Sequence, residues 1–123
     1  MELVAFITCE TGTDLIVSFA VCALEDSSEV ESLTLMRTPK YEGLLYDWER
    51  GATVTFEREK KEDDEVVLLR EVKYEPEEKV VTVTSDQRVY ELDIRKVDPE
   101  ELKKMGRVLR KMNHDSSIKL EGV

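Results

Sequence analysis

The sequence has little of the chemistry on which most enzymes depend. Among its 123 residues there is one histidine, His114, and there are two cysteines, Cys9 and Cys22. Because hydrolase triads and most acid–base pairs use histidine, no Ser-His-Asp site is expected. The cysteines lack the paired spacing of a zinc site or a redox centre, and both lie in apolar stretches, where a buried thiol is inert. We therefore expect two free thiols, no catalytic residue and a non-catalytic role.

Glycine and long apolar runs are also scarce. The five glycines are scattered too widely to form a GxGxxG or Walker loop, so no nucleotide cofactor is predicted. The longest apolar run, 15–24, has about half of the ~20 residues that cross a bilayer as a helix. The first basic residue is Arg37, so the basic start of a secretory signal is missing. These absences predict a cytoplasmic protein without membrane contact.

Basic residues are outnumbered by acidic residues, 18 against 28, which gives a formal net charge of −10. Such a chain repels phosphate backbones, so nucleic-acid binding is not expected. Residues 95–123 are the exception, with 8 basic and 5 acidic side chains. This basic region is either a docking surface for an acidic partner or, the favoured interpretation, an ordinary helix face that balances the acidic remainder of the chain.

The sequence is rich in short apolar segments separated by polar turns. Segments 2–8 and 15–24 are dense in β-branched and aromatic residues, which is typical of buried strands, and residues 10–13 form the turn between them. Further strands are predicted at 30–38, 53–57, 66–74, 80–84 and 88–94. Arg70 is in phase with the apolar residues of its strand and is expected to snorkel at a sheet edge or to pair inside with Glu57 or Glu91.

A helix is predicted from residue 99 onward. Asp98 is a good N-cap, Pro99 suits the first helical position, and Glu101 is placed to complete a capping box. One apolar stripe faces the sheet, formed by Leu102, Met105, Val108, Leu109 and Met112. We expect Gly106 to allow a close approach to the sheet, and residues 114–123 to be a frayed tail.

These elements predict an α+β fold that is mainly β. We expect an antiparallel sheet or half-open barrel of about seven strands, with one C-terminal amphipathic helix packed over it and residues 1–113 in a single globular domain. The order of elements resembles that of the pleckstrin-homology superfold. The resemblance is architectural and does not imply lipid binding, because residues 9–14, where such a site would need basic side chains, are acidic.

One acidic run, Glu62-Asp63-Asp64-Glu65, has the oxygen ligands that hard divalent cations prefer. It lacks the alternating spacing and the central glycine of an EF-hand loop, and it falls at a predicted hairpin tip. A solvated charge run is therefore the favoured interpretation, and no metal is predicted.

Segment 37–50 has no regular period and contains three of the eight aromatic residues of the chain. Tyrosine, tryptophan and arginine dominate binding hot spots, so this segment is the candidate partner-binding site. The candidate residues are Arg37, Lys40, Tyr41, Tyr46, Trp48 and Arg50. The alternative is a long connection in which Leu44, Leu45 and Trp48 close one end of the core.

The sequence alone identifies no function. The favoured hypothesis is a small protein-interaction module that binds an unknown protein partner, or a second copy of itself, through segment 37–50 or an exposed sheet edge. An alternative is a small-molecule-binding protein or enzyme with a site between sheet and helix, where carboxylates and a cysteine supply the chemistry. A third hypothesis, single-strand nucleic-acid binding, is disfavoured by the net charge.

Overall fold

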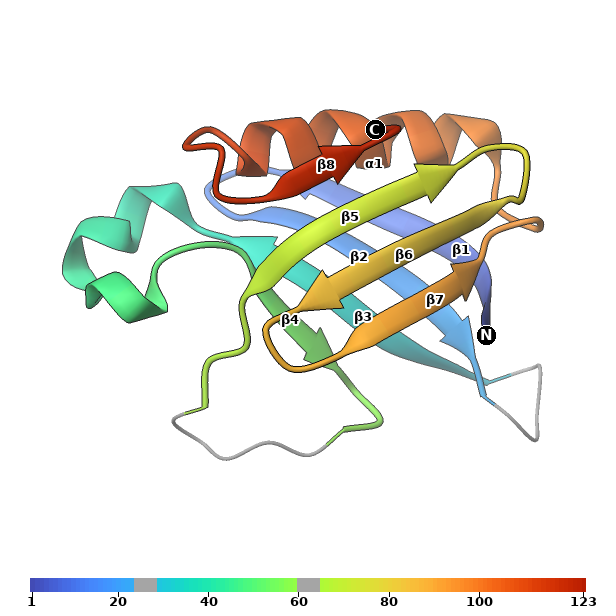
Figure 1. Cartoon of the computed structure of the whole chain (residues 1–123), viewed down its shortest axis with the longest axis horizontal. Coiled ribbons are helices and arrows are strands. Elements are labelled where there is room, and N and C mark those ends of the chain that lie inside the picture. The colour runs from blue at the N-terminus through green and yellow to red at the C-terminus, as the bar shows by residue number, and fades with distance from the viewer. Residues whose placement is uncertain (24–28, 60–64) are drawn as a thin grey trace.

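The computed structural model describes residues 1–23, 29–59 and 65–123. One sheet of eight strands is accompanied by one α-helix and two short 3-10 helices (Figure 1). The strands are β1 (Glu2–Thr11), β2 (Leu15–Cys22), β3 (Val30–Arg37), β4 (Thr53–Phe56), β5 (Leu69–Glu75), β6 (Val80–Ser85), β7 (Val89–Asp93) and β8 (Lys119–Glu121). The 3-10 helices η1 (Pro39–Leu44) and η2 (Asp47–Glu49) follow β3, and the helix α1 (Pro99–Met112) precedes β8.

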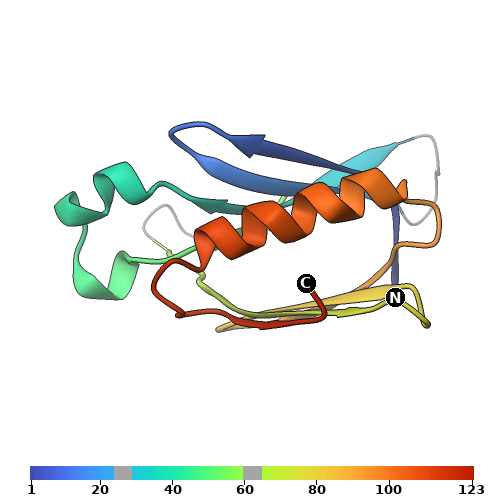
Figure 2. The same cartoon turned by 90° about the horizontal axis from the view of Figure 1, so that it is seen from above.

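The sheet consists of two antiparallel meanders, with strand order β4-β3-β2-β1-β7-β6-β5-β8. The meander β1–β4 joins the meander β5–β7 through a short parallel pairing of β1 with β7. A bridge between Thr53 and Leu68 ties β4 to the residues before β5, but the sheet is not a closed barrel. Figure 2 shows the meanders as two layers with α1 over the opening between them. The predicted α+β, mainly β fold is confirmed, although the sheet is mixed because β8 also pairs parallel with β5.

The core fills the space between the two meanders and α1. Side chains with no exposed surface come from all three parts: Val4, Val17, Phe19, Val21, Leu33, Leu35, Val72, Val81, Val83, Leu92, Met105, Leu109 and Met112. The predicted apolar stripe of α1 therefore faces the core. Burial of aliphatic side chains of this size stabilises the fold by about 1.5–3 kcal/mol each.

One of the two capping contacts predicted at the start of α1 is present. The Asp98 carboxylate accepts a hydrogen bond of 2.8 Å from the Glu100 amide. The Glu101 carboxylate does not close a capping box but accepts from the Ile7 amide of β1 at 2.8 Å. The parallel pairing of β1 with β7 extends only to Leu3. Glu101 therefore satisfies an amide near the point where the two strands separate, and it ties the helix to the sheet.

Residues 114–123 differ from the predicted frayed tail. The Asn113 side chain donates to the Ile118 carbonyl at 2.9 Å and accepts from the Ile118 amide at 2.8 Å, which closes a turn after α1. Ile118 is buried, and β8 then pairs with β5. Gly122 follows with a positive φ of 78°, at a point where an added Cβ would lie 2.2 Å from the Tyr74 carbonyl oxygen. A glycine is therefore needed for this close approach.

Two further local predictions need correction. The register of β5 shifts between Leu69 and Glu71, and Arg70 is exposed, so the predicted internal pair with Glu57 or Glu91 is wrong, and its ion-pair partner is Asp86 at 3.8 Å. Gly106 does not serve a close approach to the sheet. The nearest atom to an added Cβ there is Nη1 of Arg110, at 3.2 Å.

Candidate interaction site

Arg37 is the residue around which the candidate site is built. It is the last residue of β3 and lies in phase with Leu33 and Leu35, so its side chain points inward, and only 2% of its surface is exposed. A buried guanidinium is costly unless its charge and its hydrogen-bond donors are satisfied. Arg37 reaches the end of the core where α1 stops, and its partners there come from two separate parts of the chain, η1 and the end of α1 with the turn after it.

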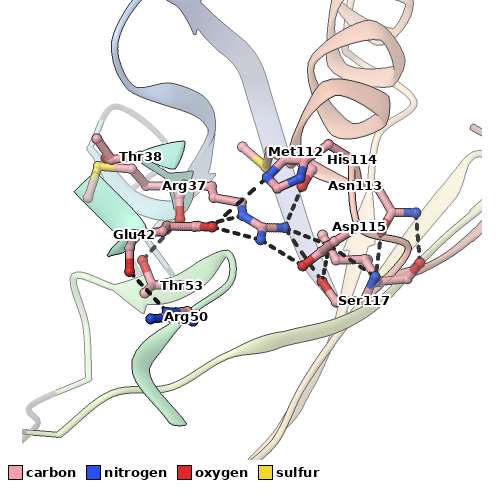
Figure 3. Close-up of polar contacts among 12 residues, drawn as sticks. Arg37, Thr38, Glu42, Arg50, Thr53, Met112, Asn113, His114, Asp115 and Ser117 are labelled. Atoms are coloured by element: carbon pink, nitrogen blue, oxygen red, sulfur yellow. Dashed lines mark hydrogen bonds and ion pairs between the residues drawn. The ribbon is translucent and has the colours of Figure 1, made fainter. Parts of the chain in front are cut away.

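Every donor of the Arg37 guanidinium has a partner (Figure 3). Nε and Nη2 donate to the two carboxylate oxygens of Glu42, at 2.6 and 3.0 Å. Nη1 and Nη2 donate to the two oxygens of Asp115, at 2.9 and 2.8 Å, and Nη1 also donates to the Met112 carbonyl at 2.7 Å. The two-pronged geometry on each carboxylate is the strong form of the arginine–carboxylate interaction. We call Arg37, Glu42, Asp115 and the Met112 carbonyl the arginine anchor.

The electrostatics of the arginine anchor favour its charged form. Hydrogen bonding to Asp115, and then to Glu42, raises the pKa of Arg37 above its ordinary value although burial opposes this. Hydrogen bonding from Arg37 lowers the pKa of both Asp115 and Glu42. The Met112 carbonyl is at the negative end of the α1 dipole, which also favours a cation. His114 Nε2 lies 4.0 Å from Glu42 and adds a second positive charge when it is protonated.

The arginine anchor holds a segment that projects from the end of the sheet (Figure 1). Glu42 belongs to η1, and neither η1 nor η2 has a buried residue. Five large apolar side chains of this segment are exposed to solvent: Tyr41, Leu44, Leu45, Tyr46 and Trp48. We call these five side chains the apolar platform. Leu44 is 84% exposed, Tyr46 72% and Trp48 61%, which is unusual for neighbouring residues of this size in a structured segment.

Local contacts organise the apolar platform and the cations beside it. The Tyr46 and Trp48 rings stack with 6.2 Å between centroids and 5° between planes. Lys40 Nζ lies over the Tyr41 ring, 5.5 Å from its centroid. Arg50 Nε donates to the Glu42 carbonyl at 3.0 Å, so this cation helps to hold the backbone of the segment.

The structure separates the six predicted site residues into two groups. Lys40, Tyr41, Tyr46, Trp48 and Arg50 lie together on the exposed segment, where a partner can reach them. Arg37 is the exception, because burial leaves its guanidinium facing Glu42 and Asp115 rather than solvent.

The alternative role for this segment is contradicted. The exposure of Leu44, Leu45 and Trp48 means that they do not close the core. Glu42 and Asp115 were not identified from the sequence. The one signal available was the two-residue spacing of Leu33, Leu35 and Arg37, which places the arginine on the inward face of its strand.

A second candidate is a groove between α1 and the β5–β8 edge, with a volume of about 520 Å³. The groove lies between sheet and helix, where a small-molecule site was one alternative, but its lining lacks the carboxylates and the cysteine expected there. The charged side chains that line it are basic, not acidic. Cys9 is not among the lining residues and lies instead beside Lys104 and Lys111 in another hollow along α1. Burial raises the pKa of the Cys9 thiol, which makes it a weaker nucleophile at neutral pH.

A third hollow, of about 490 Å³, lies between β4 and β7. Its charged groups are largely paired with each other: Arg58 contacts Glu2 at 2.8 Å and Glu31 at 3.2 Å, and the Tyr90 hydroxyl donates to Glu59 at 2.5 Å. Burial, together with the hydrogen bond to Glu59, raises the pKa of Tyr90. These contacts tie the residues after β4 to β1, β3 and β7.

In the ranges 1–23, 29–59 and 65–123, no group of three or more potential metal ligands is gathered in one place. The predicted charge run at Glu62-Asp63-Asp64 lies outside the described residues. No helix in the described part of the chain has both the length and the apolar character needed to cross a membrane. The two cysteines are free thiols, as predicted.

Comparison with protein-family models, with curated proteins and with solved structures found no match to this chain.

Proposed function

We propose that this chain is a small protein-interaction module that binds a partner protein through the apolar platform. The observation that carries the proposal is the combination of exposure and fixation. Five large apolar side chains stand in solvent on a segment that contributes nothing to the core, yet the buried arginine anchor holds that segment in place. Exposed apolar side chains add no stability to a fold, whereas they add affinity to a binding surface.

The energetic argument follows from the residue types. Tyrosine and tryptophan are enriched among hot-spot residues, which each contribute about 2 kcal/mol or more to binding. Ordering a loose segment costs roughly 1–2 kcal/mol per residue in backbone entropy. The bidentate contacts of Arg37 with Glu42 and the stacking of Tyr46 on Trp48 meet part of that cost before a partner arrives.

Charges around the apolar platform indicate the chemistry of the partner. Lys40, Asp47 and Arg50 are exposed beside it, so both signs are present at its margin. This arrangement suits a partner cleft with an apolar centre and a polar, mixed-charge rim. A second copy of the chain is included in the proposal as one such partner. The two free thiols support a reducing compartment, and we propose the cytoplasm.

The test places a photo-crosslinking residue, benzoylphenylalanine, at Tyr46 of the full chain in living cells. The matched control carries it at Val89 of β7, which is also well exposed, at 61%, but lies outside the segment. We expect discrete crosslinked protein products from position 46 that disappear when Leu44→Asp is added. Crosslinked species with the mass of two chains would identify a homodimer. Equal crosslinking from both positions, or none from position 46, would contradict the proposal.

A further inference from the structure

The groove between α1 and the β5–β8 edge has an apolar lining on both of its sides. Pro99 and Leu102 contribute from the helix, and Tyr74 and Val123 from the opposite side. Leu102, Tyr74 and Val123 are only partly buried, although all three pack against the core. The volume of about 520 Å³ is in the range of small-molecule sites. Gly106 and Gly122 line it as well, one from each side.

The rim of the groove is cationic. Lys103, Arg107 and Arg110 line it, and no acidic side chain is among the lining residues. Lys103 contacts Glu100 at 3.3 Å. Within the part of the chain that the structure describes, Arg107 and Arg110 make no ion pair and no side-chain hydrogen bond. Two guanidinium groups without a partner are notable in a chain of net charge −10, where a carboxylate is easily found.

We propose that this groove binds a small amphipathic anion, a free molecule with an apolar body and a carboxylate, sulfonate or phosphate head. The body lies against Leu102 and Tyr74, and the head is held by Arg107 and Arg110. Guanidinium groups suit this role because they bind oxyanions through paired hydrogen bonds. A nucleic-acid backbone would need only the cations of the groove. The apolar lining is therefore the feature that favours a ligand with an apolar body. The site is separate from the apolar platform and does not depend on the proposed function.

The location of binding is tested by heteronuclear NMR with anilinonaphthalene sulfonate as the probe. The five glycine amides sample distinct places, and only two of them line the groove. We expect saturable shifts of the Gly106 and Gly122 amides, with those of Gly12, Gly43 and Gly51 unchanged. Shifts confined to Gly43 and Gly51 would place the probe at the apolar platform and overturn the proposal. Absence of saturable shifts would do the same.

The role of charge is tested with a neutral probe and a matched pair of variants. N-phenylnaphthylamine keeps the apolar body but lacks the sulfonate, and we expect it to bind about tenfold more weakly. Arg110→Glu reverses a charge that lines the groove, whereas Lys111→Glu reverses its neighbour, which lines the hollow on the other side of α1. We expect Arg110→Glu to weaken binding of the sulfonate by about tenfold and Lys111→Glu by less than about twofold. Equal losses would mean that the net charge of the helix, not the groove, attracts the probe.

Other occupants of the groove give distinct results in the same titration. Vesicles of phosphatidylserine and phosphatidylcholine that bound the chain while the soluble sulfonate did not would make this face a membrane-surface contact. A single-stranded oligonucleotide that shifted Gly106 and Gly122 while the sulfonate did not would make it a nucleic-acid surface. Either result would overturn the proposal of a free small ligand.

Discussion

Arg37 and the apolar platform lie close together in the chain, within residues 37–48, and they reverse the usual distribution of residue types. Arg37 is 2% exposed and Trp48 is 61% exposed. The buried cation is affordable only because two carboxylates and a carbonyl satisfy all of its donors. The Trp48 ring stacks on Tyr46, but most of its surface remains open to solvent. The buried charge thus fixes the position of the segment, and the exposed apolar surface is then available to contact a partner.

The largest expected effect separates apolar residues of the core from those of the apolar platform. Leu109 of α1 is 0% exposed and Leu44 of η1 is 84% exposed, so the same substitution tests both. We expect Leu109→Asp to unfold the protein, with a loss of more than about 4 kcal/mol, because it places an unpaired charge in the core. Leu44→Asp should change the free energy of unfolding by less than about 0.5 kcal/mol. Urea denaturation followed by circular dichroism measures both. A similar loss for the two variants would mean that the apolar platform is packed in solution.

The next effect compares two arginines of the segment. We expect Arg37→Met to cost about 3–5 kcal/mol, because Glu42 and Asp115 then face each other without their cation. Partial solvent access to Asp115 keeps the loss toward the lower figure. Arg50→Met removes an exposed ion pair with Asp47 and an exposed hydrogen bond to the Glu42 carbonyl, and it should cost less than about 1 kcal/mol. The midpoints of urea unfolding give both values, and equal midpoints would remove the distinction between anchor and surface.

Removal of the residues after Asn113 disrupts the arginine anchor by deleting one of the carboxylates that bind Arg37. The truncated chain lacks Asp115, the buried Ile118 and β8. We expect a loss of about 2–4 kcal/mol, of which Ile118 contributes roughly 1.5–3 kcal/mol by hydrophobic burial. Thermal melting measures the loss, and limited proteolysis should show earlier cleavage between Tyr41 and Trp48. If truncation left the melting temperature unchanged, the frayed tail predicted from the sequence would be the better description.

The smallest effect is the dependence of stability on pH. The pKa values of Asp115 and Glu42 are lowered in the folded state by hydrogen bonds from Arg37. Their stabilisation is therefore fully present above the unfolded pKa values of about 4, and it is lost as the pH falls through the lowered folded values. We expect the unfolding free energy to fall more steeply between about pH 5 and pH 2 in the wild type than in Arg37→Met. Parallel curves for the two proteins would show that other carboxylates carry the acid sensitivity.

Much of the fold could be predicted because its signals are local. Strand alternation, the turns and the Asp98-Pro99 start of α1 are all contained within a few neighbouring residues. The predicted strands 2–8 and 80–84 correspond to β1 and β6 within a few residues at each end. Two errors came from features without a local signal. The register shift that exposes Arg70 is set by pairing with β6, and β8 is too short to show a periodicity of its own.

Part of the candidate site could be predicted because its signal is also local. Exposed aromatic residues such as Tyr46 and Trp48 are conspicuous in a segment without a period, and sequence alone selected them. The role of Arg37 could not be predicted, because one of its partners is Asp115, 78 positions away in the chain. The basic lining of the groove was also not predicted, because Tyr74 of β5 and Arg110 of α1 are far apart in the chain and line the same groove only once the chain has folded. A site formed by residues that are far apart in the chain cannot be predicted from sequence patterns until the topology is known.

The reach of Arg37 to Asp115 also sets an order of events during synthesis. At roughly 5–20 residues per second, about 4 to 16 seconds separate the appearance of the two residues. Throughout that interval the stacked aromatic residues of segment 39–49 have no buried guanidinium to fix them, and the C-terminal contacts of α1 do not yet exist. Long-range contacts of this kind slow folding, and exposed apolar surface favours aggregation while they are awaited. The feature that prepares the folded protein for binding therefore makes the nascent chain dependent on the synthesis of Asp115.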